Sequence, residues 1–187
     1  MHTYAAFLRA INVGGSKPLK MPQLADLVAR AGGRHVRTWI ASGNVVFGFP
    51  STDAGSVEGR LDRALCRERA VASDVIVRSV DQLESVESRN PFPEEARRDP
   101  AHLTVTFFKR PVPRAALPSL QALGRGRERV APIDRDLFVY YPEGIGRSKL
   151  TLSAMERLTG DRGTSRNWNT VVKITALAVE LRKSLNE

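Results

Sequence analysis

The pattern of apolar and polar positions along the chain predicts short strands that alternate with amphipathic helices. Residues 4–9 form an apolar run typical of a strand. Between Leu24 and Ala31 apolar residues recur at helical spacing, and a pair of glycines then ends the helix. The stretch 35–49 is rich in β-branched and aromatic residues and is interrupted at Ser42-Gly43-Asn44, which predicts a hairpin.

A second helix and a further strand complete the first half of this pattern. Apolar residues at helical spacing run from Val57 to Leu65, and residues 74–80 form an apolar strand. The resulting order, β-α-β-β-α-β, is the split βαβ arrangement of ferredoxin-like folds.

A short helix over 81–88 and the proline-rich segment 90–100 then predict a boundary. The order of elements partly recurs after it, without a repeat in the sequence itself. The expected elements are strands at 102–109, 128–133 and 136–141 and helices at 114–123, 150–158 and 170–185. We therefore expect an α+β fold of two packed ferredoxin-like subdomains, an N-terminal one over residues 1–90 and a C-terminal one, with a terminal helix, over residues 91–187.

Composition narrows the class of protein. The 187 residues are 42% apolar and 26% charged, as in ordinary globular proteins, and no apolar run approaches the roughly 18 residues that cross a bilayer. Cys66 is the only cysteine, so no internal disulfide can form, and His2, His35 and His102 lack metal-ligand spacing. We expect a cytoplasmic protein that contains no metal and does not contact a membrane.

The net charge of +9 is unevenly distributed along the chain. Residues 1–52 carry six Lys or Arg and one Asp, and residues 144–187 carry eight basic and four acidic residues. Residues 53–143 carry fifteen of each sign and sum to zero. A general preference for arginine would explain the 23 arginines, but five of the six lysines also fall in the two basic segments. A concentrated positive surplus attracts phosphates or acidic partners.

The first basic segment contains a glycine loop, LRAINVGGSKPLKM. A strand that enters a glycine loop before a helix can present backbone N–H groups to an anion, and Lys17 and Lys20 add mobile cations. Gly14 and Gly15 permit close approach of the backbone. The spacing matches neither GxxxxGK[ST] nor GxGxxG, so we expect no nucleotide cofactor. A flexible connector with solvated lysines is the other interpretation, and the residues of this loop alone favour it.

The second basic segment contains the stretch GIGRSKL, residues 144–150. Here too a strand enters a glycine loop before a predicted helix, and Arg147, Ser148 and Lys149 stand at the junction. Arginine can form a fork onto phosphate oxygens, lysine acts as a point charge, and the serine hydroxyl can cap the helix or bind. Cations oppose the helix dipole at this end, and local conflicts of this kind tend to mark binding sites.

A third stretch, TSRNWNTVVK, precedes the last predicted helix. Asn169 or Thr170 is the expected cap of that helix, and Trp168 is expected to be a buried anchor. Arg166 is a candidate for ligand binding, and Asn167 either binds ligand or satisfies neighbouring backbone groups. No GxSxG, HExxH or SxxK pattern is present, so the sequence assigns no catalytic residue.

Four motifs, LRAINVGGSKPLKM, VRTWIASGNVVF, GIGRSKL and SRNWNTVVKI, resemble the domain-of-unknown-function 1697 family of bacterial proteins in their order and spacing. The resemblance runs from about Tyr4 to Leu181, and Trp39 stands where relatives often have tyrosine. It implies two ferredoxin-like α+β subdomains and implies no activity.

The sequence thus favours a binding protein whose two basic segments form one anion-binding surface for nucleic acid or a phosphorylated small molecule. One alternative is an enzyme that acts on a small phosphorylated or acidic substrate, and another is a module that docks an acidic protein partner. The candidate site residues are Asn12, Gly14, Gly15, Lys17, Lys20, Asn44, Gly146, Arg147, Ser148, Lys149, Arg166 and Asn167.

Overall fold

The computed structural model describes residues 1–9, 19–40, 43–69, 74–124 and 127–187 of the chain. They form two compact units: unit 1 comprises Met1–Ser85 with Lys173–Glu187, and unit 2 comprises Val86–Val172. Within these ranges no helix combines the length and the apolar character that a membrane span requires.

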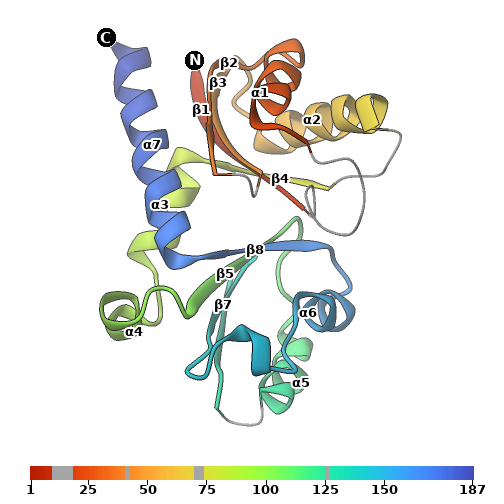
Figure 1. Ribbon diagram of the computed structural model, residues 1–187, viewed down its shortest axis with the longest axis vertical. Helices are drawn as coiled ribbons and strands as arrows, with labels where there is room; N and C mark the ends of the chain where they lie inside the picture. The colour runs from red at the N-terminus through yellow and green to blue at the C-terminus, as the bar shows by residue number, and fades with distance from the viewer. Residues whose placement is uncertain (10–18, 41–42, 70–73, 125–126) are drawn as a thin grey trace. The chain divides into compact units, whose positions relative to one another are not determined.

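Unit 1 has the predicted order of elements (Figure 1). Its elements are β1 (His2–Leu8), α1 (Met21–Arg30), β2 (Arg34–Trp39), β3 (Asn44–Phe49), α2 (Ala54–Arg69), β4 (Val75–Ser79) and the first part of α3 (Val80–Ser88). The strands form an antiparallel sheet in the order β2-β3-β1-β4, which confirms the predicted split βαβ arrangement.

Helices α1 and α2 cover one face of this sheet. Their apolar stripes pack on alternate residues of the strands, such as Tyr4, Ala6 and Leu8 of β1 and Phe47 of β3, all of which are buried. Pro22 lies in the first turn of α1, where its missing N–H is not needed. The period-two pattern of the strands and the helical period of α1 and α2 therefore meet in a single core.

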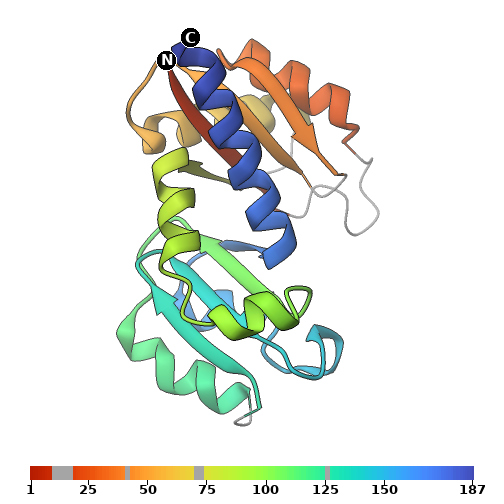
Figure 2. The same ribbon diagram turned by 90° about the vertical axis from the view of Figure 1, so that its left-hand side faces the viewer.

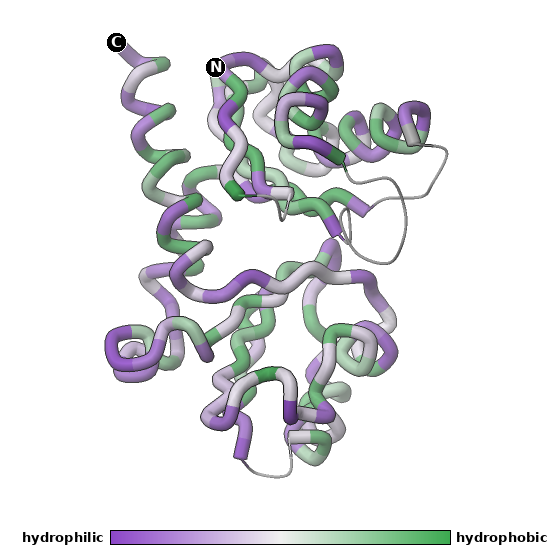
Figure 3. The backbone as a smooth tube through the Cα atoms, in the orientation of Figure 1, coloured by the Kyte–Doolittle hydropathy of each residue, from purple (hydrophilic) through white to green (hydrophobic). Residues whose placement is uncertain are grey.

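The C-terminal part of helix α7 (Trp168–Asn186) covers the other face of the unit 1 sheet, opposite α1 and α2 (Figures 1 and 2). Figure 3 shows its two faces as alternating apolar and polar segments, and Ile174, Ala178 and Leu181 of the apolar face are buried. At the surface Arg37 of β2 forms an ion pair with Glu180 at 2.7 Å. Burial of the apolar face thus attaches the end of the chain to unit 1.

Unit 2 repeats the order of strands with different lengths of connection. Its elements are α4 (Pro93–Arg98), β5 (Leu103–Phe108), the 3₁₀ turn η1 (Arg114–Ala116), α5 (Leu117–Leu123), β6 (Arg129–Ile133), β7 (Asp136–Tyr140), the 3₁₀ turn η2 (Ile145–Arg147), α6 (Leu152–Thr159) and β8 (Gly163–Asn167). The sheet order is β6-β7-β5-β8. Helix α4 lies in the proline-rich boundary segment, where the sequence predicted no helix. A helix can begin there because Pro93 occupies its first turn, where proline is tolerated.

The two sheets place buried polar residues at matching positions. The first residue of β3 and of β7 is polar, and so is the fourth residue of β4 and of β8. The register pairs are Phe7 with Asn44, Ala5 with Arg78, Phe107 with Asp136 and Val105 with Arg166. The units thus correspond in structure although the sequence shows no repeat.

Helix α7 begins two residues before the predicted start, at Trp168. The Asn167 side-chain oxygen accepts a hydrogen bond from the backbone N–H of Thr170 at 2.9 Å. The expectation that Asn169 or Thr170 caps this helix is therefore wrong, because Asn167 stands at the position from which a side chain reaches the first free N–H groups. Trp168 is buried, as predicted, with its ring centroid 6.3 Å from that of Phe138. The division of domains at residue 90 stays a prediction.

The cap can be tested with two matched substitutions. Asn167→Ala should lower the free energy of unfolding by about 1 kcal/mol, because it removes an acceptor from the start of a helix. Asn169→Ala, at an equally exposed position inside the helix, should change it by less than about 0.5 kcal/mol. Urea denaturation followed by circular dichroism measures both values. An equal or larger loss for Asn169→Ala would contradict the assignment.

Candidate anion-binding site

The connection from β7 to α6, residues 141–151, carries the second basic motif. The Tyr141 hydroxyl donates a hydrogen bond to the Leu150 carbonyl at 2.9 Å, and both residues are buried. Gly144 adopts φ 79° and ψ 151°, a backbone region that is essentially open to glycine alone. Burial, and then the negative charge of Glu128, raises the pKa of Tyr141, so its phenol stays a donor at neutral pH. The two ends of this connection are therefore held together.

The relation of this motif to the helix differs from the prediction. Helix α6 begins at Leu152 instead of Leu150, and the Thr151 hydroxyl caps it by accepting from the Ala154 N–H at 3.3 Å. Arg147 and Lys149 thus lie before the cap and not in the first helical turn, so the predicted start of the helix at Leu150 is wrong. The backbone N–H groups of Arg147 and Ser148 donate within the η2 turn, at 3.4 and 3.1 Å. These two N–H groups are therefore already used within the turn.

Side chains of this connection line a cavity of about 310 Å³ in unit 2. The opposite wall comes from the end of α5 and the residues after it. The lining residues are Leu123, Gly124, Arg127, Glu128, Tyr141, Pro142, Glu143, Gly144, Arg147, Ser148 and Lys149. Three of the predicted site residues, Arg147, Ser148 and Lys149, are brought together in one wall, whereas Gly146 is exposed and does not line the cavity.

The charges in this cavity divide into paired and unpaired groups. The Glu128 carboxylate accepts a hydrogen bond from the Ser148 hydroxyl, and Glu143 forms an ion pair with Arg127 at 2.6 Å. Arg147 and Lys149 are exposed, and among the described residues neither side chain has an ion-pair partner. The cavity therefore has two positive groups available to an anion. Sequence reasoning missed Glu128 and Tyr141, for which the sequence offers no signal.

The remaining predicted residues of unit 1 lie elsewhere. Asn12, Gly14, Gly15 and Lys17 fall outside the described residues. Lys20 is exposed immediately before α1, and its backbone N–H donates to the Gln23 side chain at 3.1 Å. Asn44 is fully buried and donates to the Trp39 carbonyl at 3.2 Å, which links the start of β3 to the end of β2. A single surface formed by both basic segments stays a prediction.

Arg166 and Asn167 belong to β8, and neither lines the cavity. Arg166 is 8% exposed and donates to the Thr164 hydroxyl at 2.7 Å and to the Ser165 carbonyl at 2.8 Å. Burial lowers the pKa of Arg166 to about 10, so the side chain stays charged at neutral pH. The contacts of this motif thus hold the strand and the start of the last helix.

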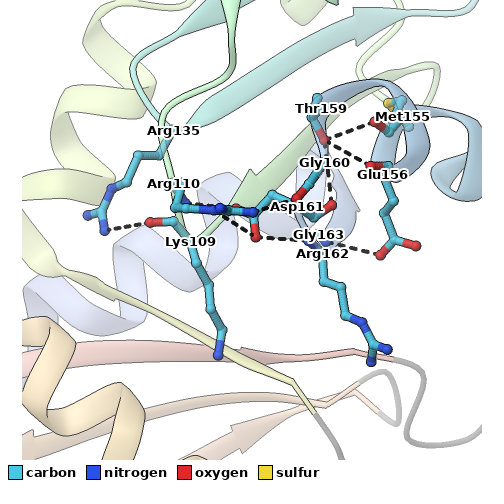
Figure 4. A network of polar contacts seen from close by, with 10 residues as sticks. All are labelled: Lys109, Arg110, Arg135, Met155, Glu156, Thr159, Gly160, Asp161, Arg162 and Gly163. Carbon is cyan, nitrogen blue, oxygen red and sulfur yellow. Dashed lines mark hydrogen bonds and ion pairs between the residues drawn. The ribbon is translucent and has the colours of Figure 1, made fainter.

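A second polar network fixes the turn between α6 and β8 (Figure 4). The Asp161 carboxylate accepts from the backbone N–H groups of Arg110 at 2.8 Å and Arg162 at 2.9 Å. The Glu156 carboxylate accepts from the N–H of Gly163 at 3.0 Å. These carboxylates therefore accept hydrogen bonds from backbone N–H groups, and the turn that they fix leads into the edge strand β8.

The fold and the cavity define a class of protein: an α+β chain with two ferredoxin-like units and a polar cavity in the second. Residues 1–138 match the family described as "Protein of unknown function (DUF1697)", and the chain belongs to this family. The chain is also similar to a solved structure, "conserved bacterial protein SP0830 from Streptococcus pneumoniae", with a TM-score of 0.75 and 20% identity over 95% of this chain and 98% of that one. This likeness shows the fold. Comparison with curated proteins gave no match.

The clamp at the base of the connection can be tested with a matched pair of tyrosines. Tyr141→Phe should lower the free energy of unfolding by about 1–3 kcal/mol, because it leaves the buried Leu150 carbonyl without its partner. Tyr140→Phe removes a partly exposed hydroxyl that donates to Asp99 at 3.1 Å, and should cost less than about 0.5 kcal/mol. Denaturation in urea gives both values, and similar losses for the two variants would refute the clamp.

Proposed function

We propose that this protein binds an anionic, phosphorylated ligand in the unit 2 cavity, that Arg147 and Lys149 make the contacts, and that Ser148, which donates to Glu128, holds the wall between them. One observation carries the proposal: Glu143 of the cavity is neutralised by Arg127, and the two exposed cations Arg147 and Lys149 outnumber the remaining carboxylate, Glu128, which accepts from the Ser148 hydroxyl. A cytoplasmic location, expected from the single cysteine, is part of this proposal.

The chemistry of the wall favours phosphate. The planar guanidinium of Arg147 can donate two parallel hydrogen bonds to phosphate oxygens, and Lys149 adds a compact charge beside it. The Ser148 hydroxyl accepts a hydrogen bond from the Leu150 backbone N–H at 3.0 Å. This bond fixes the residue that separates Arg147 from Lys149 in the sequence. A concave cavity of about 310 Å³ is the size of a small-molecule site, so it suits a phosphorylated metabolite better than a polymer.

Removal of the two cations should weaken binding. We expect Arg147→Gln with Lys149→Gln to weaken the affinity for inorganic phosphate or pyrophosphate by at least about tenfold, because charge-assisted hydrogen bonds are lost. Arg114→Gln with Arg157→Gln is the matched control, since both residues are exposed in unit 2 and lie outside the cavity. Thermal shift and calorimetry measure the affinities.

Three outcomes would contradict the proposal. The first is that the wild-type protein binds neither phosphate nor pyrophosphate, and the second is that both double variants lose affinity equally. The third is that an acidic protein partner binds through Arg147 and Lys149 while phosphate does not bind. Turnover of a phosphorylated compound that the same double variant abolishes would support the enzyme alternative.

A substitution of opposite sign gives a second test. Glu128→Gln keeps an oxygen that can accept from the Ser148 hydroxyl, but removes a negative charge from the cavity. The affinity for phosphate should therefore rise several-fold at low salt, and the increase should shrink as salt screens the charges. Calorimetric titration at two salt concentrations measures the effect. Unchanged or weaker phosphate binding would place the anion away from Glu128.

A further inference from the structure

A second cavity, of about 370 Å³, lies between α1 and α2 of unit 1 and is rich in arginine. Its lining residues are Leu27, Arg30, Ala31, Arg60, Arg63, Ala64, Arg67 and Glu68, and we call it the arginine groove. Its floor is apolar, and its four arginines and its glutamate are exposed. It belongs entirely to unit 1, so it is independent of the cavity that the proposed function uses.

Helix α2 presents three of its four arginines on one face. Arg60, Arg63 and Arg67 are spaced i, i+3 and i+7, which brings them to the same side of a helix. Like charges at these spacings destabilise a helix, so the fold alone does not favour this arrangement. The row extends roughly 10 Å along the helix axis, at 1.5 Å per residue.

The other acidic side chains of α2 are used by the neighbouring strand. Glu58 accepts from the Val77 N–H at 2.9 Å, and Asp62 accepts from the Val75 N–H at 2.8 Å. Strand β4 is an edge of the unit 1 sheet, and these carboxylates satisfy its outward N–H groups. They therefore face β4 and do not line the groove.

The groove has little negative charge of its own. Glu68 pairs with Arg30 at 2.9 Å, and the Arg60 guanidinium lies 5.8 Å from the ring centroid of Phe49. Within the described ranges Arg60, Arg63 and Arg67 have no carboxylate partner. Three unneutralised guanidinium groups in one open groove form an anion-binding surface that is longer than a single phosphate.

We infer that the arginine groove binds the phosphodiester backbone of a nucleic acid without reading its sequence. A row of arginines can contact several successive phosphates at once, and such contacts position a backbone but carry no base information. Among the described residues, the aromatic ring that contacts the row is that of Phe49, which is buried and so offers no surface for base stacking. The ligand class is therefore a phosphate chain of a polymer.

The test measures binding of a labelled thymidine homopolymer to the whole chain by fluorescence anisotropy over a series of salt concentrations. Arg63→Gln with Arg67→Gln should weaken binding by about tenfold or more at low salt. It should also reduce the slope of log K against log salt by about 1.4, which corresponds to two phosphate contacts on a single strand. Glu68→Gln should strengthen binding, because it releases Arg30 from its ion pair.

The double variant Arg114→Gln with Arg157→Gln again supplies the control, with the same change of charge on exposed positions of unit 2. Unchanged melting temperatures establish that the variants fold. An equal loss in this control would show that net charge alone drives binding, and would overturn the inference. So would saturable binding of inorganic tripolyphosphate without binding of the polymer, or no binding of either. Loss of phosphate binding at the unit 2 cavity would leave this result unaffected, so the two proposals fail separately.

Discussion

Buried backbone N–H groups need hydrogen-bond acceptors, and this requirement decides which charged side chains remain available in this protein. Carboxylates and amides can accept, whereas guanidinium and ammonium groups only donate. Backbone N–H groups at the edge of β4 donate to Glu58 and Asp62. Backbone N–H groups near the turn before β8 donate to Asp161, and one at the start of α7 donates to Asn167. In helix α2 this use of Glu58 and Asp62 leaves Arg60, Arg63 and Arg67 without a carboxylate partner among the described residues. The arginine groove follows from that asymmetry, although the local sequence is balanced in charge.

The order of elements follows from the sequence because it depends on hydrophobic period, which burial enforces over many residues. Strands such as β3 and helices such as α1 lie close to their predicted positions for this reason. Boundaries depend on single hydrogen bonds, and several side chains near a boundary can supply them. Asn167, Asn169 and Thr170 all have cap chemistry, and only the direction in which the chain leaves β8 selects Asn167. Helix α4 was not predicted because its single proline, Pro93, suits both a loop and a first helical turn.

The candidate site, too, could be predicted from the sequence only in part. Arg147 and Lys149 could be found from sequence because they stand in a glycine-containing loop inside a basic segment, and loops carry function. The carboxylates that share their cavity could not be found, because Glu128 comes from a different connection. The arginine groove could not be found from the net charge of its segment. Residues 53–143 carry fifteen charges of each sign, and their sum does not show on which face of a helix each charge lies. The helical spacing of Arg60, Arg63 and Arg67 was the signal that could have located it.

The two units share a strand order, yet their positive surfaces differ in kind, and the connections explain why. Residues 50–53 join β3 to α2, whereas the longer segment 141–151 joins β7 to α6. The sheets keep matching register on both sides of these connections, so the extra residues of unit 2 are not needed to form its sheet. A hydrogen bond from Tyr141 to Leu150 joins the two ends of the segment, and residues between them form part of the cavity wall. In unit 1 only residues 50–53 stand at the corresponding place, and the positive surface of the described residues lies on the helices α1 and α2 that cover the sheet. The longer segment after β7 therefore gives unit 2 a cavity wall at a place where the corresponding connection of unit 1 has room for none.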